Sequence, residues 1–104
     1  MGNNWNVYDA IREKLILPND FGSIVPYPKC FLVSIYGSPE RMGLFDRDGR
    51  ELVPAIFNDI KALGDGLFAI AKDSKWGLTN TKGDKLLLLE HTFEGVERKA
   101  ARFQ

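Results

Sequence analysis

Residues 46–51 hold the most suggestive group of side chains for binding a metal ion. They have the order Asp-Arg-Asp-Gly-Arg-Glu, which superficially resembles the start of a calcium-binding loop. Such a loop also needs a third early oxygen ligand and a bidentate glutamate at its twelfth position, where this chain has Phe57. An Asp-Gly turn between two strands accounts for the same residues. We therefore expect a hairpin turn here and no metal site.

Paired carboxylates are the next group that could perform chemistry, because neighbouring carboxyl groups can act as general acid and general base. Asp46 lies two positions before Asp48, and Glu94 lies three before Glu97. Nothing near either pair in the sequence indicates the burial that would raise a carboxyl pKa. Solvated positions are the better interpretation of both pairs.

Cys30 is the one residue that could serve as a thiol nucleophile. It precedes the apolar residues 31–33, and the single histidine, His91, lies 61 positions away in the sequence. A catalytic thiol needs a lowered pKa and a base partner, so a buried thiol is favoured. Residues 64–66, Gly-Asp-Gly, are no phosphate loop, because no Lys-Ser or Lys-Thr pair follows them. We expect a protein that is not an enzyme, with no catalytic residues and no cofactor.

The composition of the 104 residues narrows the class of protein further. Fourteen basic and 14 acidic side chains give no net charge, which argues against binding nucleic acid. The longest apolar run, the five residues 67–71, is far shorter than the ~18 residues of a membrane helix. Residues 1–6 lack the basic region and apolar segment of a secretory signal. We expect a single cytoplasmic domain over residues 1–104, with no membrane partner.

The elements that position these residues are internal repeats. With an offset of 36, Phe21 aligns with Phe57 and then with Phe93. Residues 42–46 align with residues 76–80 at an offset of 34, so the length changes where loops are expected. A degenerate copy of the same segment begins at Trp5. The sequence predicts three units, at about residues 5–41, 42–75 and 76–104, of which the last is shortened.

Each unit has the pattern of antiparallel strands. Residues 67–71 form an apolar stretch of strand length, a polar turn follows, and a second strand begins at Trp76. Apolar runs without alternation indicate strands that are covered on both faces. A helix is the alternative at residues 5–16, where the turn glycine is missing, although the repeat register favours a strand there. We predict an all-β fold, an antiparallel β-meander of about three repeats.

This pattern is similar to the bacterial WG repeat. The shared pattern is Trp-Gly, two apolar residues, Asp, a glycine turn, an apolar pair with Pro, Phe/Tyr-x-x-Ile and Asp-Gly-Leu-x-x-Ile. The segments of this chain that carry it are residues 42–46, 52–54, 57–60, 64–70 and 75–78. Asn6 replaces the glycine in the first copy, and Met42 replaces the tryptophan in the second. The resemblance implies a β-rich repeat scaffold and carries over no catalytic residue.

The candidate binding residues lie where the chain departs from the repeat pattern. Tyr27 lies between two prolines in a segment whose counterpart in the next unit has no aromatic residue, and Lys29 follows it. Tyr36 and Arg41 bracket a loop that is longer in the first unit. Aromatic anchors concentrate binding energy in protein interfaces. We predict a partner-binding surface at Tyr27, Lys29, Tyr36 and Arg41, and expect Tyr27→Ala to leave stability nearly unchanged.

These residues predict a non-enzymatic protein-binding module, including the inhibitor or immunity type that blocks a larger target protein. The shortened third unit offers an open sheet edge, through which copies of the chain could pair as a structural, self-assembling unit. A carbohydrate or small-ligand binder with Trp5 or Trp76 as a stacking platform is the remaining alternative.

Overall fold

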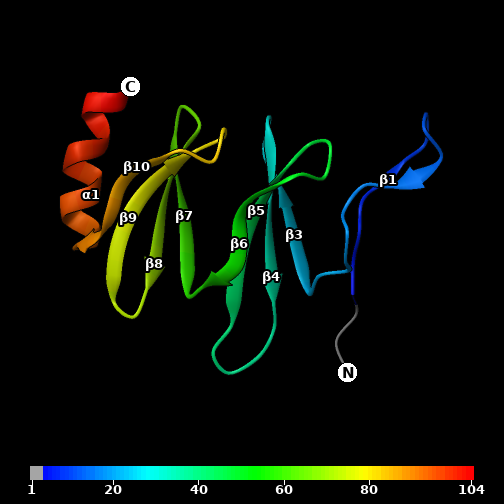
Figure 1. Ribbon diagram of the computed structural model, residues 1–104, viewed down its shortest axis with the longest axis horizontal. Coiled ribbons are helices and arrows are strands. Elements are labelled where there is room, and N and C mark those ends of the chain that lie inside the picture. Colours follow the sequence, from blue (N-terminus) through cyan, green and yellow to red (C-terminus); the bar gives the residue numbers. More distant parts are fainter. Residues whose placement is uncertain (1–3) are drawn as a thin grey trace.

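The computed structural model describes residues 4–104 (Figure 1). Residues 1–3, on which the prediction of a missing signal partly depends, lie outside the described residues. The described chain forms strands up to His91 and a helix after it. The elements are β1 (Tyr8–Asp9), β2 (Lys14–Leu15), β3 (Ser23–Pro26), β4 (Cys30–Ile35), β5 (Arg41–Asp46), β6 (Glu51–Phe57), β7 (Asp59–Gly64), β8 (Leu67–Lys72), β9 (Lys75–Asn80), β10 (Lys85–His91), α1 (Phe93–Ala100) and the 3-10 helix η1 (Ala101–Phe103).

The strands form antiparallel meanders, which confirms the predicted fold class. The first sheet has the order β3-β4-β5-β6, and the second has the order β7-β8-β9-β10. A separate two-stranded hairpin pairs β1 with β2. Asn58 alone separates the two larger sheets in the sequence. Within residues 4–104, no helix has the length and apolar character needed to cross a membrane.

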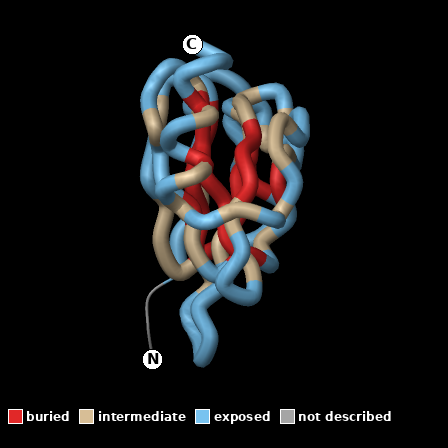
Figure 2. Tube along the Cα trace, turned by 90° about the vertical axis from the view of Figure 1, so that its left-hand side faces the viewer, coloured by how far each residue is buried: buried red, intermediate tan, exposed pale blue. Residues whose placement is uncertain are grey.

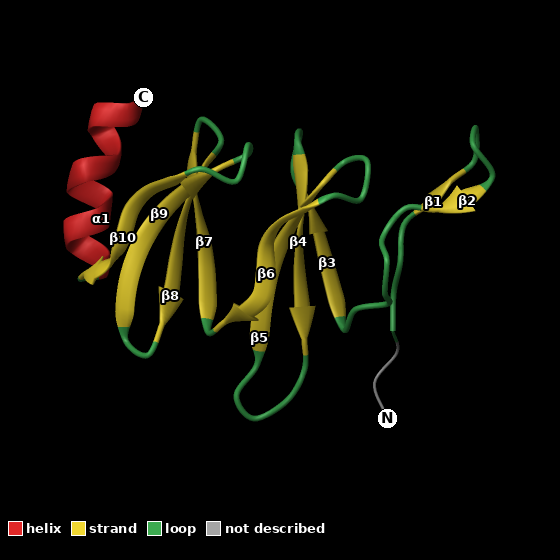
Figure 3. Ribbon diagram, viewed as in Figure 1, coloured by secondary structure: helices red, strands yellow, loops and turns green. Residues whose placement is uncertain are grey.

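The elements are stacked along the longest axis of the molecule (Figures 1 and 3). The central apolar cluster joins the two sheets, with Leu44 from one and Phe68 from the other. A second cluster joins the first sheet to the N-terminal segment through Leu17 and Phe21, and a third joins the second sheet to α1 through Val96. The strands β4 and β8 are therefore covered on both faces, as their unbroken apolar runs predicted. The same prediction is wrong for the apolar run 86–89 in β10, an outer strand of the second sheet, where Leu88 is exposed. Figure 2 shows that the buried residues lie in the interior of the molecule and that exposed residues surround them.

The glycine of each repeat allows two strands of one sheet to approach closely. A Cβ atom on Gly43 would lie 2.6 Å from the carbonyl oxygen of Val53, and one on Gly77 would lie 2.6 Å from that of Leu87. Both positions adjoin irregular register in the pairing of β5 with β6 and of β9 with β10. In the first unit, Asn6 stands at this position, and its side chain instead accepts hydrogen bonds from the backbone and donates to the carbonyl of Leu17.

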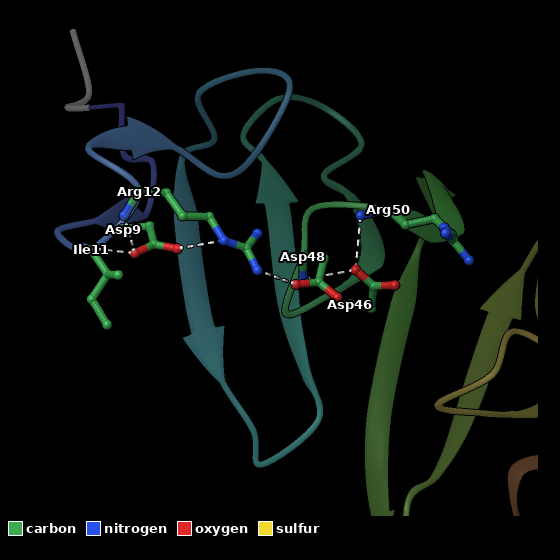
Figure 4. Close-up of polar contacts among 6 residues, drawn as sticks. All are labelled: Asp9, Ile11, Arg12, Asp46, Asp48 and Arg50. Atoms are coloured by element: carbon green, nitrogen blue, oxygen red, sulfur yellow. Dashed lines mark hydrogen bonds and ion pairs between the residues drawn. The ribbon is translucent and has the colours of Figure 1, made fainter.

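One polar side chain organises the turn of each repeat. Oδ1 of Asp46 accepts the backbone N–H groups of residues 48 and 50, and Oδ1 of Asn80 accepts those of residues 82 and 84. Oδ1 of Asp9 accepts the N–H groups of Ile11 and Arg12 in the first unit (Figure 4). The hydrogen bond from Arg12 is the main cause that lowers the pKa of Asp9. The expected hairpin turn at residues 46–51 is thus present.

In the second and third units, a second glycine, in the turn, makes the contact between successive layers. Gly49 has a φ of +89°, and a Cβ atom there would overlap the carbonyl oxygen of Ile16. Gly83 has a φ of +81°, and its Cβ would lie 3.1 Å from the carbonyl oxygen of Leu52. Ile16 and Leu52 are 36 positions apart, which is the repeat offset. The turn of one unit therefore rests on the backbone of the unit before it.

Both chain ends differ from part of the sequence prediction. The alternative of a helix at residues 5–16 is wrong, because β1 and β2 pair there. The helix lies at the other end, where the strand pattern predicted for the third unit ends at β10 and is followed by α1 and η1. Thr92 caps α1 by accepting the N–H of Gly95, and Val96 and Ala100 place a buried stripe at helical spacing. The basic residues Arg98 and Lys99 lie in the last turn of α1, and Arg102 lies in η1.

Candidate functional site

A cleft of about 510 Å³ opens between the two sheets, at the end of the strands where three turns meet. These are the turns from β3 to β4, from β7 to β8 and from β9 to β10. The residues that line it are Tyr27, Pro28, Lys29, Ala62, Gly64, Asp65, Gly66, Leu67, Phe68 and Thr81. We refer to this set as the cleft. Its volume lies within the roughly 300–1,000 Å³ that is typical of ligand pockets.

Tyr27 forms an aromatic wall of the cleft. Its backbone N–H donates to the carbonyl oxygen of Cys30 at 2.8 Å, which closes the turn into β4. Its ring meets the ring of Phe68 at 5.2 Å between centroids and 87° between planes, an edge-to-face arrangement. The half-buried Tyr27 also packs against the central apolar cluster. The aromatic wall is therefore held in place by the core.

The opposite wall is a tight turn with left-handed backbone. Gly64, Asp65 and Gly66 have φ values of +91°, +54° and +75°. Such values favour glycine, and aspartate tolerates them better than most residues. A Cβ atom on Gly66 would come within 3.5 Å of the Thr81 side chain, so the second and third turns are in contact.

The charges of the cleft lie at its rim. Lys29 and Asp65 are both exposed, and they come from turns on different sheets. A cation and a carboxylate beside the aromatic wall suit a ligand with apolar groups and charges of both signs. Within residues 4–104, no group of three or more His, Cys, Asp or Glu side chains is placed to hold a metal ion.

The structure divides the four predicted binding residues into two pairs. Tyr27 and Lys29 line the cleft, just before β4 begins. Tyr36 and Arg41 lie at the other end of β4, where Arg41 is the register partner of Ile35. They border the β4–β5 loop, which lies at the opposite end of the sheet from the turn between β3 and β4 (Figure 1). The four residues do not form one surface.

Tyr36 belongs to a different groove, of about 380 Å³. Its ring lies over Gly22, where a Cβ atom would be only 2.7 Å from the ring. Trp5 lies on the same groove, and both aromatic side chains are more than half exposed, at 56% for Trp5 and 60% for Tyr36. Trp76 is different, because its ring packs on Phe93 of α1 at 4.8 Å between centroids.

The sequence prediction missed the wall of the cleft formed by Asp65, Phe68 and Thr81. In the sequence, residues 64–66 show the repeat pattern and no phosphate-binding motif. The repeat offset was the signal that could have found them. Units that stack in register bring turns one repeat apart next to each other, so the segment after Tyr27 lies beside the turn after Ala62.

A comparison with protein-family models matches residues 42–76 to the WG containing repeat. This segment is a WG repeat. It begins at β5 and ends as β9 begins, so the WG repeat takes two strands from each sheet. None of the curated proteins and none of the solved structures compared with the chain matches it.

The WG repeat and the sheets are therefore out of phase by two strands. Gly43 and the turn at Asp46 belong to the first sheet, whereas Phe68 belongs to the second. The cleft lies where the first sheet and the second sheet of this WG repeat meet. It is formed by the stacking of repeats and by no single unit.

Proposed function

We propose that this protein is a non-enzymatic protein-binding module that holds a short segment of a partner protein in the cleft. The observation that carries the proposal is the combination in one cleft of the Tyr27–Phe68 aromatic wall with the exposed charges of Lys29 and Asp65. Aromatic side chains held rigidly in this way are typical anchors of protein interfaces. A module of this kind could block a larger target, as an inhibitor or immunity-type protein does.

The proposal favours a peptide segment over a small metabolite because the cleft is open and its polar groups lie at the rim. The anchoring side chain of the partner would pack on Tyr27. Charged groups beside it would face Lys29 and Asp65. Rim charges affect the rate of association and the choice of partner more than they affect affinity.

Site-specific photo-crosslinking tests the proposal directly. A photoreactive amino acid is placed at Lys29, at the rim of the cleft, and in a matched control at Lys75, which is exposed at the opposite end of the strands. We expect a protein partner to be crosslinked from Lys29 and not from Lys75. The association rate constant of that partner should fall at least tenfold in Lys29→Glu and stay unchanged in Lys75→Glu. Equal crosslinking from both positions, or equal association rates of both variants, would contradict the proposal.

A carbohydrate ligand is a second candidate function, and the groove between Trp5 and Tyr36 favours it. Two exposed aromatic rings beside one groove can stack on the apolar face of a sugar ring. The exposed Trp5 provides a fluorescence signal, whereas Trp76 is packed on α1. Quenching or enhancement of tryptophan fluorescence by a sugar, lost in Trp5→Phe, would support this function. A panel of sugars without effect on the fluorescence of the wild-type chain would count against it.

A further inference from the structure

The N-terminal hairpin presents an apolar face that nothing in the described chain covers. Its exposed side chains are Tyr8, Ile11 and Leu15, at 60%, 95% and 58% of their full exposure. Tyr8 and Leu15 are register partners, so their side chains lie on the same face of the hairpin. We call these three residues the N-terminal face.

This face points away from the first sheet. Val7 packs against the apolar cluster that joins the N-terminal segment to the first sheet. Successive side chains of an extended strand point to opposite sides, so the neighbouring Tyr8 points outward. In Figures 1 and 3, the hairpin is the element at the far end of the stack from α1.

The repeat shows that this face corresponds to a surface that is covered elsewhere in the molecule. Tyr8 aligns with Phe45 in the second unit. Phe45 is buried, and its ring contacts that of Phe21 from the preceding layer at 5.5 Å between centroids. The N-terminal face therefore continues an interface that is formed inside the molecule one repeat later.

The other end of the stack has the opposite character. The helix α1 buries Val96 and Ala100 against the second sheet and exposes Glu94, Glu97 and Arg98. A repeat stack needs a polar outer face at its terminal units to remain in solution. In the described chain, α1 presents such a polar face, whereas the N-terminal face is apolar.

The turn of the hairpin also differs from the turns that support a stacked layer. Gly49 can rest on the preceding layer because it has no Cβ atom. Arg12 stands three positions after Asp9, as Gly49 does after Asp46, and its guanidinium instead contacts Asp48 at 3.5 Å (Figure 4). A further layer of the same kind could not pack on this turn in the same way.

We infer that the N-terminal face is a dimer interface that packs on the same face of a second copy of this chain, about a two-fold axis. A two-fold contact is closed, because both copies use the same face. The polar end with α1 stays outside this contact. The hairpin tip carries two acidic and two basic residues, so two copies do not repel each other: these are Asp9, Arg12, Glu13 and Lys14. The area offered by three large side chains is below that of a standard interface, so we expect a dissociation constant of roughly 10 µM to 1 mM.

Sedimentation equilibrium tests the inference with the full chain between 5 µM and 2 mM. We expect the average mass to rise from the 11.7 kDa of one chain toward twice that value. Leu15→Glu together with Ile11→Glu should weaken self-association at least tenfold. Leu88→Glu is the matched control, because Leu88 is equally exposed, at 60%, and lies on β10.

A second measurement does not depend on stability of the hairpin. Ile11→Cys, in a chain whose Cys30 is replaced by alanine, should form a disulfide-linked dimer under mild oxidation, whereas Leu88→Cys should not. A chain that stays monomeric at 2 mM, or a dimer that Leu88→Glu disrupts as strongly as the hairpin variants, would overturn the inference. Equal crosslinking through both cysteine variants would overturn it as well.

Discussion

The ring of Tyr27 meets the ring of Phe68 edge-on, at 5.2 Å between centroids, across the boundary between the two sheets. Tyr27 is therefore both a wall of the cleft and a part of the central apolar cluster. The sequence predicted that Tyr27→Ala would hardly change stability. Because the ring of Tyr27 contacts Phe68, we now expect that variant to be less stable than the wild-type chain.

We predict that Tyr27→Ala lowers the free energy of unfolding by about 1–3 kcal/mol, because it removes an aromatic pair and leaves a void beside Phe68. Tyr27→Phe keeps the ring and should cost less than about 1 kcal/mol. Urea unfolding of both variants measures the difference. If both variants were as stable as the wild-type chain, the ring would not be part of the core.

The contact between layers can be measured at two glycines with nearly the same backbone. Gly49 and Gly64 have φ values of +89° and +91°, so Gly→Ala adds similar backbone strain at both, about 1–2 kcal/mol. A Cβ atom on Gly49 would strike the carbonyl oxygen of Ile16, whereas one on Gly64 has no atom within 4 Å. Gly49→Ala should therefore lower the free energy of unfolding by about 1–3 kcal/mol more than Gly64→Ala. Equal losses in the two variants would show that the layers can separate there without penalty.

The two tryptophans should respond differently to truncation. Trp76 packs on Phe93 and holds α1 against the second sheet. Trp76→Ala should lower the free energy of unfolding by about 3 kcal/mol and reduce the helical signal in circular dichroism. Trp5→Ala, at an exposed position, should leave both the stability and the helix nearly unchanged. A helical signal that survives Trp76→Ala in full would mean that α1 docks without this contact.

The stability of the fold should depend on alkaline pH through Cys30. Burial raises the pKa of this thiol, against a smaller opposite effect of the Arg47 charge. The unfolded chain loses the thiol proton at its ordinary pKa, whereas the folded chain keeps it to higher pH. The contribution to stability is thus complete below the ordinary thiol pKa and is lost as the pH rises toward the folded value.

Thermal unfolding between pH 7 and pH 10.5 measures this dependence. Cys30→Ala should flatten the decrease at the alkaline end, in comparison with the wild-type chain. Identical slopes for both chains would show that the thiol does not contribute. Thiol-specific reagents should also modify Cys30 far more slowly in the native chain than in urea, because its side chain is fully buried.

Repetition made most of the fold predictable from the sequence. The alignment of Phe21 with Phe57, and of Asp46 with Asn80, located strands and turns because stacked units must repeat the same contacts. The last unit broke the pattern, since Thr92 caps a helix and Val96 with Ala100 supplies its buried stripe. Alignment with earlier copies gave no warning of this, because Phe93 and Val96 also match the apolar positions of a strand.

The candidate site was only partly predictable. Proline-flanked Tyr27 stood out in the sequence, and Lys29 followed from its position. Asp65 and Phe68 belong to the next sheet, and only the stacking in space brings them to Tyr27. Tyr36 was selected for the longer loop that it borders, but it lies at the other end of β4 from Tyr27, and no local pattern separates the two residues in this way.

Gly49 packs on the backbone of Ile16, and Gly83 packs on that of Leu52. These repeated contacts bear on how long such a molecule could be. Both contacts between layers use equivalent positions of the repeat. A duplicated block of 36 residues between the two sheets could therefore form the same contacts with the layers on either side. Each added block would move the two ends of the molecule apart by about 10 Å, the usual spacing of packed sheets. The distance between the N-terminal hairpin and α1 could therefore be increased in steps of one repeat, without a change in the residues at either end.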